Sequence, residues 1–243
     1  MATKKKVTKV ETPESTDSKV TQKSIDDFKI TPESKKRAKS KRIISFVLWA
    51  LAIAAEGVAI WLLTKPPINM TYLIILVVVD LILVVIANVV WQQANRLDPA
   101  YKKDKAKFFV QSQLGAIMSV IAFAPFLIMA LMNKDLDKKQ KGLISIIAVI
   151  AMAIAVWTGI DFNPPSVEEY AEQTQHVEQL TGQNLVYWTK SGTKYHLFDD
   201  CYTINSTRTD EIFEGTVAQA RELKNITDLC RICENRWVEE HPD

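Results

Sequence analysis

The chain has 243 residues, enough for one or two domains, and a formal net charge of only +2 at pH 7. Its charges are unevenly distributed: residues 1–42 carry thirteen Lys/Arg and six Asp/Glu, whereas residues 161–243 carry seven Lys/Arg and sixteen Asp/Glu. A C-terminal segment this acidic repels phosphate groups, so we expect no nucleic-acid partner.

Residues 1–30 are rich in Lys, Thr, Ser and Glu and contain few large apolar side chains. Because such a segment can bury little apolar surface, we predict a disordered basic tail. The sequence Thr31-Pro32-Glu33 then combines an N-cap residue, a proline at the first helical position and an acid in the first turn. It predicts a helix over residues 31–42 that continues into the apolar segment after it.

The predicted helix over residues 31–42 carries a cluster of basic residues next to the membrane. Such a cluster binds anionic lipid headgroups and fixes this end of the chain on the cytoplasmic side. No cleavable signal peptide is expected, because the first apolar run is longer than the 7–15 residues of a signal sequence. The cluster consists of Lys35, Lys36, Arg37, Lys39, Lys41 and Arg42.

Residues 43–160 form a block of four long apolar runs separated by short polar loops. Each run reaches or approaches the roughly 20 residues that a helix needs to cross a bilayer core of ~30 Å. Continuous apolar runs favour helices over strands, and only helices or closed barrels satisfy their backbone groups in lipid. The sequence therefore predicts a multi-pass protein of the plasma membrane, mainly α-helical, with a four-helix transmembrane bundle. The runs cover residues 43–64, 71–92, 108–132 and 143–160.

The charges in the loops leave two topologies open. Loop 93–107 carries five Lys/Arg, which fits the cytoplasmic side, but loop 133–142 carries four lysines where strict alternation places it outside. A third run that re-entered on the same side, broken at Pro125, would remove this conflict. We prefer four complete spans with both ends of the chain in the cytoplasm, because the third run is long enough to cross.

Two acidic residues, Glu56 and Asp80, lie deep inside the first and second runs. At 1.5 Å per residue both lie about 12–14 Å below the outer ends of their helices, so their carboxyl groups are expected to meet at one depth. No Lys or Arg lies within the runs, so the pair should retain at least one proton. One interpretation is a proton or cation site. The other is a protonated pair that only hydrogen-bonds two helices.

A second polar contact is expected nearer the inner face, between Asn88 and either Gln111 or Gln113. Amide side chains commonly hydrogen-bond across transmembrane helices. We therefore interpret these residues as a packing contact.

The C-terminal segment predicts a linker helix followed by a small α+β domain. Ser166 and Glu169 form a capping box that begins the helix, Gly182 ends it, and the linker covers residues 161–183. The domain covers residues 184–243. It should contain a β-hairpin, with strands over 185–189 and 193–196, then a helix from Thr216 to about Lys224 and a short last helix.

All three cysteines of the chain, with one histidine, have the spacing of a metal site. His196 and Cys201 are separated by four residues, and Cys230 and Cys233 by two. Three thiolates and one imidazole form a closed tetrahedral set typical of structural zinc, so we predict one zinc ion per chain. The alternatives are a Cys230–Cys233 redox pair, or Asp199 or Asp200 in place of the histidine.

Residues 184–234 contain a series of short motifs: Val186-Tyr187-Trp188-Thr189, Ser191-Gly192, Tyr195-His196, Cys201, Glu214-Gly215-Thr216, Ala218, Ala220 and Cys230-x2-Cys233. With these motifs the segment resembles a small bacterial domain that is similar to the metal-binding domain of the Ada DNA-repair protein and recurs at the C-terminus of bacterial membrane and surface proteins. The resemblance implies a zinc-bound hairpin and helix with ligands at His196, Cys201, Cys230 and Cys233. Ada has four cysteine ligands, one of which accepts methyl groups, so the histidine and the acidic surface here argue against carrying over methyl transfer or DNA binding.

The sequence leaves three functional hypotheses. The first is a non-enzymatic membrane protein that contacts lipids, associates with copies of itself and presents a zinc domain to an unidentified protein partner. The second is a small transporter or channel, coupled to protons or cations, that uses Glu56 and Asp80. The third is a thiol-redox or metal sensor.

Overall fold

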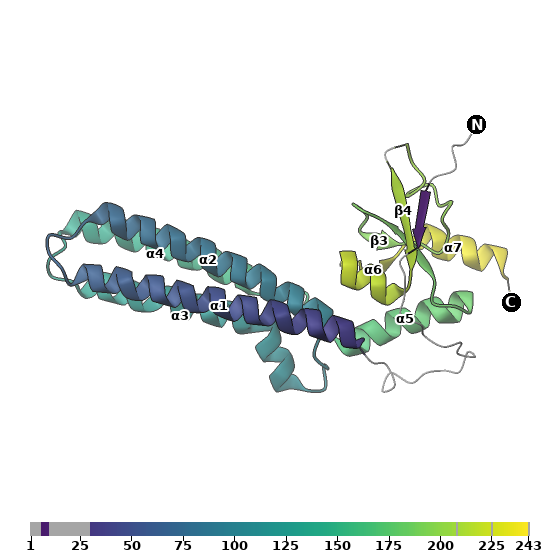
Figure 1. The fold of residues 1–243 in the computed structure, drawn as a ribbon, viewed down its shortest axis with the longest axis horizontal. Coiled ribbons are helices and arrows are strands. Elements are labelled where there is room, and N and C mark those ends of the chain that lie inside the picture. Colours follow the sequence, from purple (N-terminus) through teal and green to yellow (C-terminus); the bar gives the residue numbers. More distant parts are fainter. Residues whose placement is uncertain (1–5, 10–29, 208, 225, 243) are drawn as a thin grey trace. The chain divides into compact units, whose positions relative to one another are not determined.

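The structure, a computed structural model, describes residues 6–9, 30–207, 209–224 and 226–242. It separates into two compact units (Figure 1). One unit contains residues 31–164, and the other combines residues 1–30 with residues 165–243.

The first unit is a bundle of four long helices. α1 packs along α2 and α3, and α4 also packs along α2 and α3. All four helices are long and apolar enough to cross a membrane, as predicted. Their bounds are α1 Pro32–Leu63, α2 Met70–Leu97, α3 Lys105–Met132 and α4 Lys138–Gly159.

The ends and continuity of these helices follow from local sequence. The side chain of Thr31 accepts a hydrogen bond from the Ser34 backbone N–H at 3.2 Å, and α1 runs without a break from the basic cluster into the first apolar run. α3 passes through Pro125 as one helix of 28 residues, so the break at Pro125 on which the re-entrant alternative relied does not form. At 1.5 Å per residue this helix is about 42 Å long, more than a bilayer core requires.

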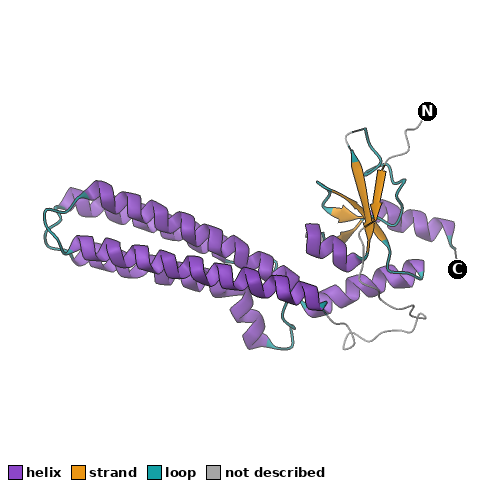
Figure 2. Ribbon diagram, viewed as in Figure 1, coloured by secondary structure: helices purple, strands orange, loops and turns teal. Residues whose placement is uncertain are grey.

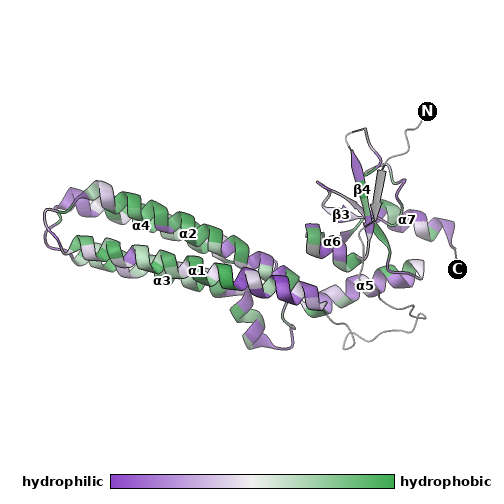
Figure 3. Cartoon of the chain, in the orientation of Figure 1, coloured by the Kyte–Doolittle hydropathy of each residue, from purple (hydrophilic) through white to green (hydrophobic). Residues whose placement is uncertain are grey.

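Many alanines, together with a few large side chains such as Trp49 and Phe123, fill the interior of the bundle, and large apolar side chains cover its outside. The buried core contains alanines such as Ala52, Ala122 and Ala148, whereas residues such as Ile82 and Ile146 are more than half exposed. Figure 3 shows hydrophobic residues along most of the length of the helical bundle. A surface of this kind is typical of a protein that faces lipid.

The second unit is small and mixed, with short strands and helices (Figure 2). β2 (Val186–Thr189) pairs antiparallel with β4 (Glu211–Gly215), and β3 (Lys194–Tyr195) pairs in parallel with β5 (Asp228–Leu229). The predicted hairpin is present, because Tyr187 and His196 exchange two backbone hydrogen bonds of 2.7 Å. β4 was not predicted, since Glu214-Gly215-Thr216 was interpreted only as the start of a helix.

Strand β1 (Lys6–Lys9) corrects the prediction of a tail disordered throughout residues 1–30. It pairs in parallel with β4, so the three-stranded sheet has the order β1-β4-β2. The pairing needs a partner about 200 residues away, which no local pattern in the tail could reveal. Residues 1–5 and 10–29 of the predicted tail lie outside the described residues.

Helix α5 (Val167–Thr181) has the predicted caps but is part of the domain, not a linker. Ser166 caps its N-terminus, and Gly182, with φ of 72°, ends it. Its Val177 belongs to the core of the unit, and Arg221 of α6 (Val217–Lys224) donates to its Tyr170 carbonyl oxygen at 3.1 Å. The unit ends with α7 (Arg231–Glu240).

Candidate functional site

Two of the four predicted metal ligands are placed by the pairing of β3 with β5. Tyr195 is the register partner of Leu229, and the Cys230 backbone N–H donates to the Tyr195 carbonyl oxygen at 2.9 Å. His196 and Cys230 therefore directly follow this register pair on two adjacent parallel strands. Parallel strands place such residues side by side, so the sheet itself brings the imidazole to the first thiol.

The other two ligands come from a turn and a helix start. The carbonyl oxygen of Cys201 accepts from the backbone N–H groups of Ile204 and Asn205, at 3.0 and 2.8 Å, which closes a tight turn around this cysteine. Cys233 lies in the first turn of α7, three residues after Cys230. Positions three residues apart share one face of a helical turn, so both sulfur atoms point to the same side.

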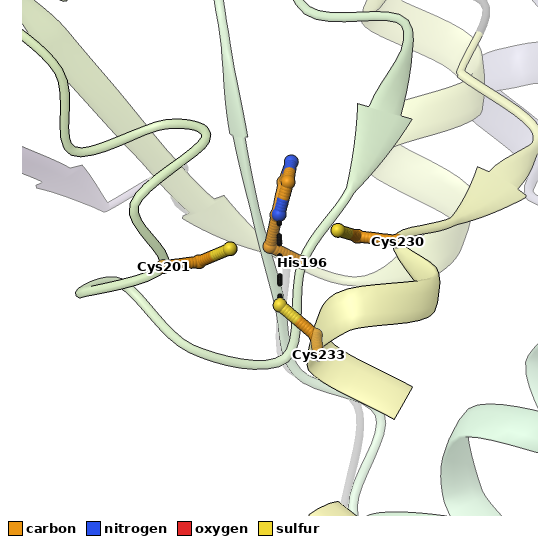
Figure 4. A group of neighbouring side chains, drawn as sticks. All are labelled: His196, Cys201, Cys230 and Cys233. Carbon is orange, nitrogen blue, oxygen red and sulfur yellow. Dashed lines mark hydrogen bonds between the residues drawn. The ribbon is translucent and has the colours of Figure 1, made fainter. Parts of the chain in front are cut away.

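The four ligand atoms lie within 4.8 Å of one another, and Figure 4 shows the three sulfur atoms arranged around the His196 ring nitrogen. His196 Nδ1 is 3.6 Å from Cys233 Sγ. Bond lengths of about 2.3 Å for Zn–S and about 2.05 Å for Zn–N at a tetrahedral angle imply an N···S separation of about 3.6 Å. The arrangement can therefore hold a metal ion without rearrangement of this pair.

Burial shifts the pKa values of side chains in the cluster. All four side chains are buried, and the three cysteines are free thiols without a disulfide. Burial, with a contribution from Lys194, lowers the pKa of His196 to about 4, so the imidazole is neutral as a metal ligand must be. Burial raises the pKa of Cys233 to about 12. Deprotonation of this thiol therefore requires a positive charge in the cluster.

The environment of Cys230 lowers the pKa of its thiol, in contrast to that of Cys233. Its burial would raise the pKa, but the backbone N–H groups of Cys233 and Ile232 at the start of α7, with the Thr203 hydroxyl, lower it below the ordinary value. Thr203 was missed by the sequence analysis. Its Oγ1 lies 3.1 Å from Cys201 Sγ and 3.4 Å from His196 Nδ1, and its position two residues after Cys201 was the available signal.

The alternatives left open by the sequence are not favoured by this geometry. Asp199 and Asp200 are exposed, and Asp200 pairs with Arg236 at 2.7 Å, so neither replaces His196. His176 is exposed and pairs with Glu234 of α7 at 2.8 Å, away from the cluster. A Cys230–Cys233 redox pair would leave His196 and Cys201 without a role.

Glu56 and Asp80, the two acidic residues within the apolar runs, are buried residues of α1 and α2. Glu56 and Asp80 are both more than nine-tenths buried and lie close enough to interact electrostatically. Glu56 Oε1 accepts a hydrogen bond of 3.0 Å from the backbone N–H of Phe126, the residue after Pro125. Asp80 Oδ1 is buried without a hydrogen-bond partner among the described residues. One carboxyl group is thus tied to α3, and the other is not.

Asn88 is the centre of the second polar contact, but its partners differ from the predicted glutamines. Its side-chain amide donates to Ser119 Oγ at 3.1 Å and to the Ala155 carbonyl oxygen at 2.9 Å, and its Oδ1 accepts from Trp49 Nε1 at 3.2 Å. Gln113 is only half-buried and lies outside this network. Asn88 therefore connects all four helices, which supports a packing role.

The basic cluster on α1 divides into two groups. Lys35, Lys36, Arg37 and Lys39 are exposed. Lys41 and Arg42 are half-buried and bind residues at the C-terminal end of α2, Lys41 to Gln93 at 2.6 Å and Arg42 to Asp98 at 2.8 Å. The first group is therefore the more exposed part of the cluster.

Comparison of the chain with protein-family models, with curated proteins and with solved structures found no match in any of the three.

Proposed function

We propose that this protein is a non-enzymatic integral membrane protein whose C-terminal domain is held together by one structural zinc ion and presents a surface to a protein partner. The observation that carries the proposal is the buried group of four ligand atoms within 4.8 Å, in a chain with four potential membrane spans. A set of three thiolates and one imidazole is typical of structural zinc, and such a set leaves no open position for a water or substrate.

The size of the domain also favours a structural metal. Domains of this length bury little apolar surface, and many depend on a metal or on disulfides for stability. Here the cysteines are free thiols. His196, Cys201, Cys230 and Cys233 join two strands, a turn and a helix, so one zinc ion would connect most of the small domain. We keep the resemblance to the Ada metal-binding domain as part of this proposal.

Metal analysis of the purified full-length protein tests the zinc assignment. We expect about one zinc per chain, less than a tenth of that in Cys230→Ser, and an unchanged content in His176→Gln. His176 is the matched control because it is a histidine of the same domain outside the cluster. Metal-free wild-type protein with an intact C-terminal fold would disprove the assignment.

Both ends of the chain are proposed to lie in the cytoplasm. The pairing of β1 with β4 supports an even number of crossings, because the first and last segments can share a sheet only on one side of the membrane. The exposed Lys35, Lys36, Arg37 and Lys39 favour the cytoplasmic side. A membrane-impermeant thiol reagent with a chelator should label the protein only after cell lysis. Labelling in intact cells would place the domain outside.

The partner is proposed to bind the acidic surface of the domain. Residues 161–243 carry sixteen acids against seven Lys/Arg, and Glu172, Asp199, Asp228 and Glu239 are among the exposed acids. Partners captured by cross-linking in cells should be lost in Cys230→Ser and retained in the double variant Glu56→Gln/Asp80→Asn. Loss in the double variant alone would instead assign the function to the membrane unit.

A second function, proton-coupled transport, is favoured by one observation. Asp80 Oδ1 is buried in the bundle without a hydrogen-bond partner among the described residues, which is a costly arrangement if the residue only stabilises packing. Purified protein in liposomes with a pH gradient tests this function. Proton flux that is lost in Asp80→Asn and kept in Cys230→Ser would establish transport, and absence of flux in the wild type would exclude it.

A further inference from the structure

Strand β4 has a neighbour on each edge, and the two neighbours come from opposite ends of the chain. β2 pairs with one edge, and β1, from Lys6–Lys9, pairs with the other in parallel. Without β1, that edge would present unpaired backbone N–H and C=O groups. Such an edge is the kind of surface to which extended peptides add as an extra strand.

The register gives this edge a chemical preference. Lys6 is the register partner of Glu211, and Lys9 is the register partner of Glu214, so the register pairs a basic residue type with an acidic one at both ends of the paired segment. The two residues between the lysines are β-branched and lie opposite apolar residues of β4. Opposite charges on paired strands stabilise one register, and β-branched residues favour the extended conformation.

β4 is anchored in the domain by contacts that do not involve β1. Ile212 is in the buried core, and the Phe213 ring stacks on Trp188 with 6.2 Å between centroids. β4 also pairs with β2 over its length, from Thr189↔Ile212 to Val186↔Gly215. The strand is therefore a preformed platform, and β1 is an addition to it.

We propose that this edge of β4 is a binding site for an extended basic peptide with the pattern Lys-x-x-Lys, and that residues 6–9 of the same chain are its resident occupant. An outside strand of the same pattern binds only after β1 leaves, so the N-terminal segment controls access to the edge. The inference goes beyond the proposed function, because it requires neither the zinc ion nor an identified partner.

A variant lacking residues 1–9 opens the site for measurement. The probe is a fluorescent peptide with the sequence of residues 1–12, and binding is followed by anisotropy in detergent. We expect saturable binding to the deletion variant and at least tenfold weaker binding to the full-length protein, whose own strand competes. Absence of binding to the deletion variant, or equal binding to both proteins, overturns the proposal.

Two matched controls separate strand pairing from attraction between charges. A probe carrying Val7→Pro and Thr8→Pro keeps every charge but cannot form the strand, so it should bind at least tenfold more weakly. A deletion variant carrying Glu211→Lys and Glu214→Lys should no longer bind the wild-type probe. It should instead bind a probe carrying Lys6→Glu and Lys9→Glu. Equal binding of the proline probe would mean that charge alone holds the peptide and would refute the site.

If the deletion variant does not fold, a measurement on the full-length protein tests the same pairing. In the full-length protein, Val7→Pro/Thr8→Pro should speed hydrogen exchange at least tenfold for those backbone amides of residues 211–215 that point to the β1 edge, and leave the amides on the β2 edge and in α7 unchanged. Unchanged exchange at β4 refutes the pairing. A dimer that becomes a monomer on deletion of residues 1–9 would mean that β1 comes from a second copy, which also overturns the assignment of the occupant.

Discussion

Replacing Gly159 by alanine should destabilise the helical unit, whereas the same change at Gly142, on the same helix, should not. A Cβ atom at Gly159 would lie 2.5 Å from the Ala116 backbone nitrogen and 2.5 Å from the Gly115 carbonyl carbon. Ordinary contacts begin at 3.4 Å, so α4 would have to move away from α3 by about 1 Å. At Gly142, no atom lies within 4 Å of the added Cβ.

The expected loss of stability in Gly159→Ala follows from the contacts that the movement of α4 disturbs. Overpacking of this kind costs typically 1–3 kcal/mol. The shift would also stretch the hydrogen bond of 2.9 Å from Asn88 to the Ala155 carbonyl oxygen of α4, at about 1 kcal/mol. Gly159→Ala should therefore lower the free energy of unfolding by about 2–4 kcal/mol. Gly142→Ala should raise it by about 0.5–1 kcal/mol, because alanine is the better helix former.

Unfolding in mixed micelles with increasing SDS, followed by far-UV circular dichroism, measures both variants against the wild type. Gly115→Ala should behave like Gly159→Ala, since its Cβ would lie 2.8 Å from the Gly159 carbonyl oxygen. If Gly159→Ala unfolds within about 0.5 kcal/mol of the wild type, the close approach of α3 and α4 is refuted.

Three further variants test the buried polar groups. His196→Cys should still bind zinc. Between pH 5.5 and 7, the slope of the logarithm of its zinc affinity against pH should be larger by about one than in the wild type, as measured by chelator competition. The reason is that the imidazole, with a pKa of about 4, is already unprotonated in that range and the new thiol is not; an unchanged slope would show that His196 binds zinc from its protonated form. Glu56→Leu should lower the free energy of unfolding by about 1–2 kcal/mol, because the Phe126 N–H loses its acceptor, while Glu56→Gln retains a carbonyl oxygen there and should cost less. Asp80→Leu should not destabilise the bundle in the same assay, since no hydrogen bond to its Oδ1 is lost; a loss above 1 kcal/mol would reveal a structural role for Asp80.

The features predicted correctly from sequence are those set by nearby residues. Run length and hydropathy are enough to define four helices. The start of α1 at Thr31 and the capped start of α5 at Ser166 depend on residues within one turn. The residues of the candidate metal cluster were singled out because a Cys-x2-Cys turn must present two sulfur atoms to one side, and His196 and Cys201 lie near each other in the sequence.

The features that were missed depend on partners far away in the chain. β1 and β4 are short: β1 is a strand through its pairing with β4, and β4 pairs with both β1 and β2. α5 was interpreted as a linker because its apolar face is narrow, and only the positions of Val177 and Arg221 show that it packs on the domain. The partners of Asn88 depend on how each helix is rotated about its axis, and a run of uniformly apolar residues does not specify that rotation.

The cluster around His196 and the pair Glu56 and Asp80 differ in the cation that each could bind. The cluster at His196 supplies four converging ligand atoms, which is a complete shell for a tetrahedral metal ion. The intramembrane site supplies only two carboxyl groups, and Glu56 already accepts a hydrogen bond from Phe126. Hard metal cations need about six oxygen ligands, whereas a proton needs one or two. No Lys or Arg lies within the four apolar runs, so the charge of Glu56 and Asp80 is best balanced by a proton. This is why proton flux, and not metal uptake, is the measurement that separates a transport role from a packing role.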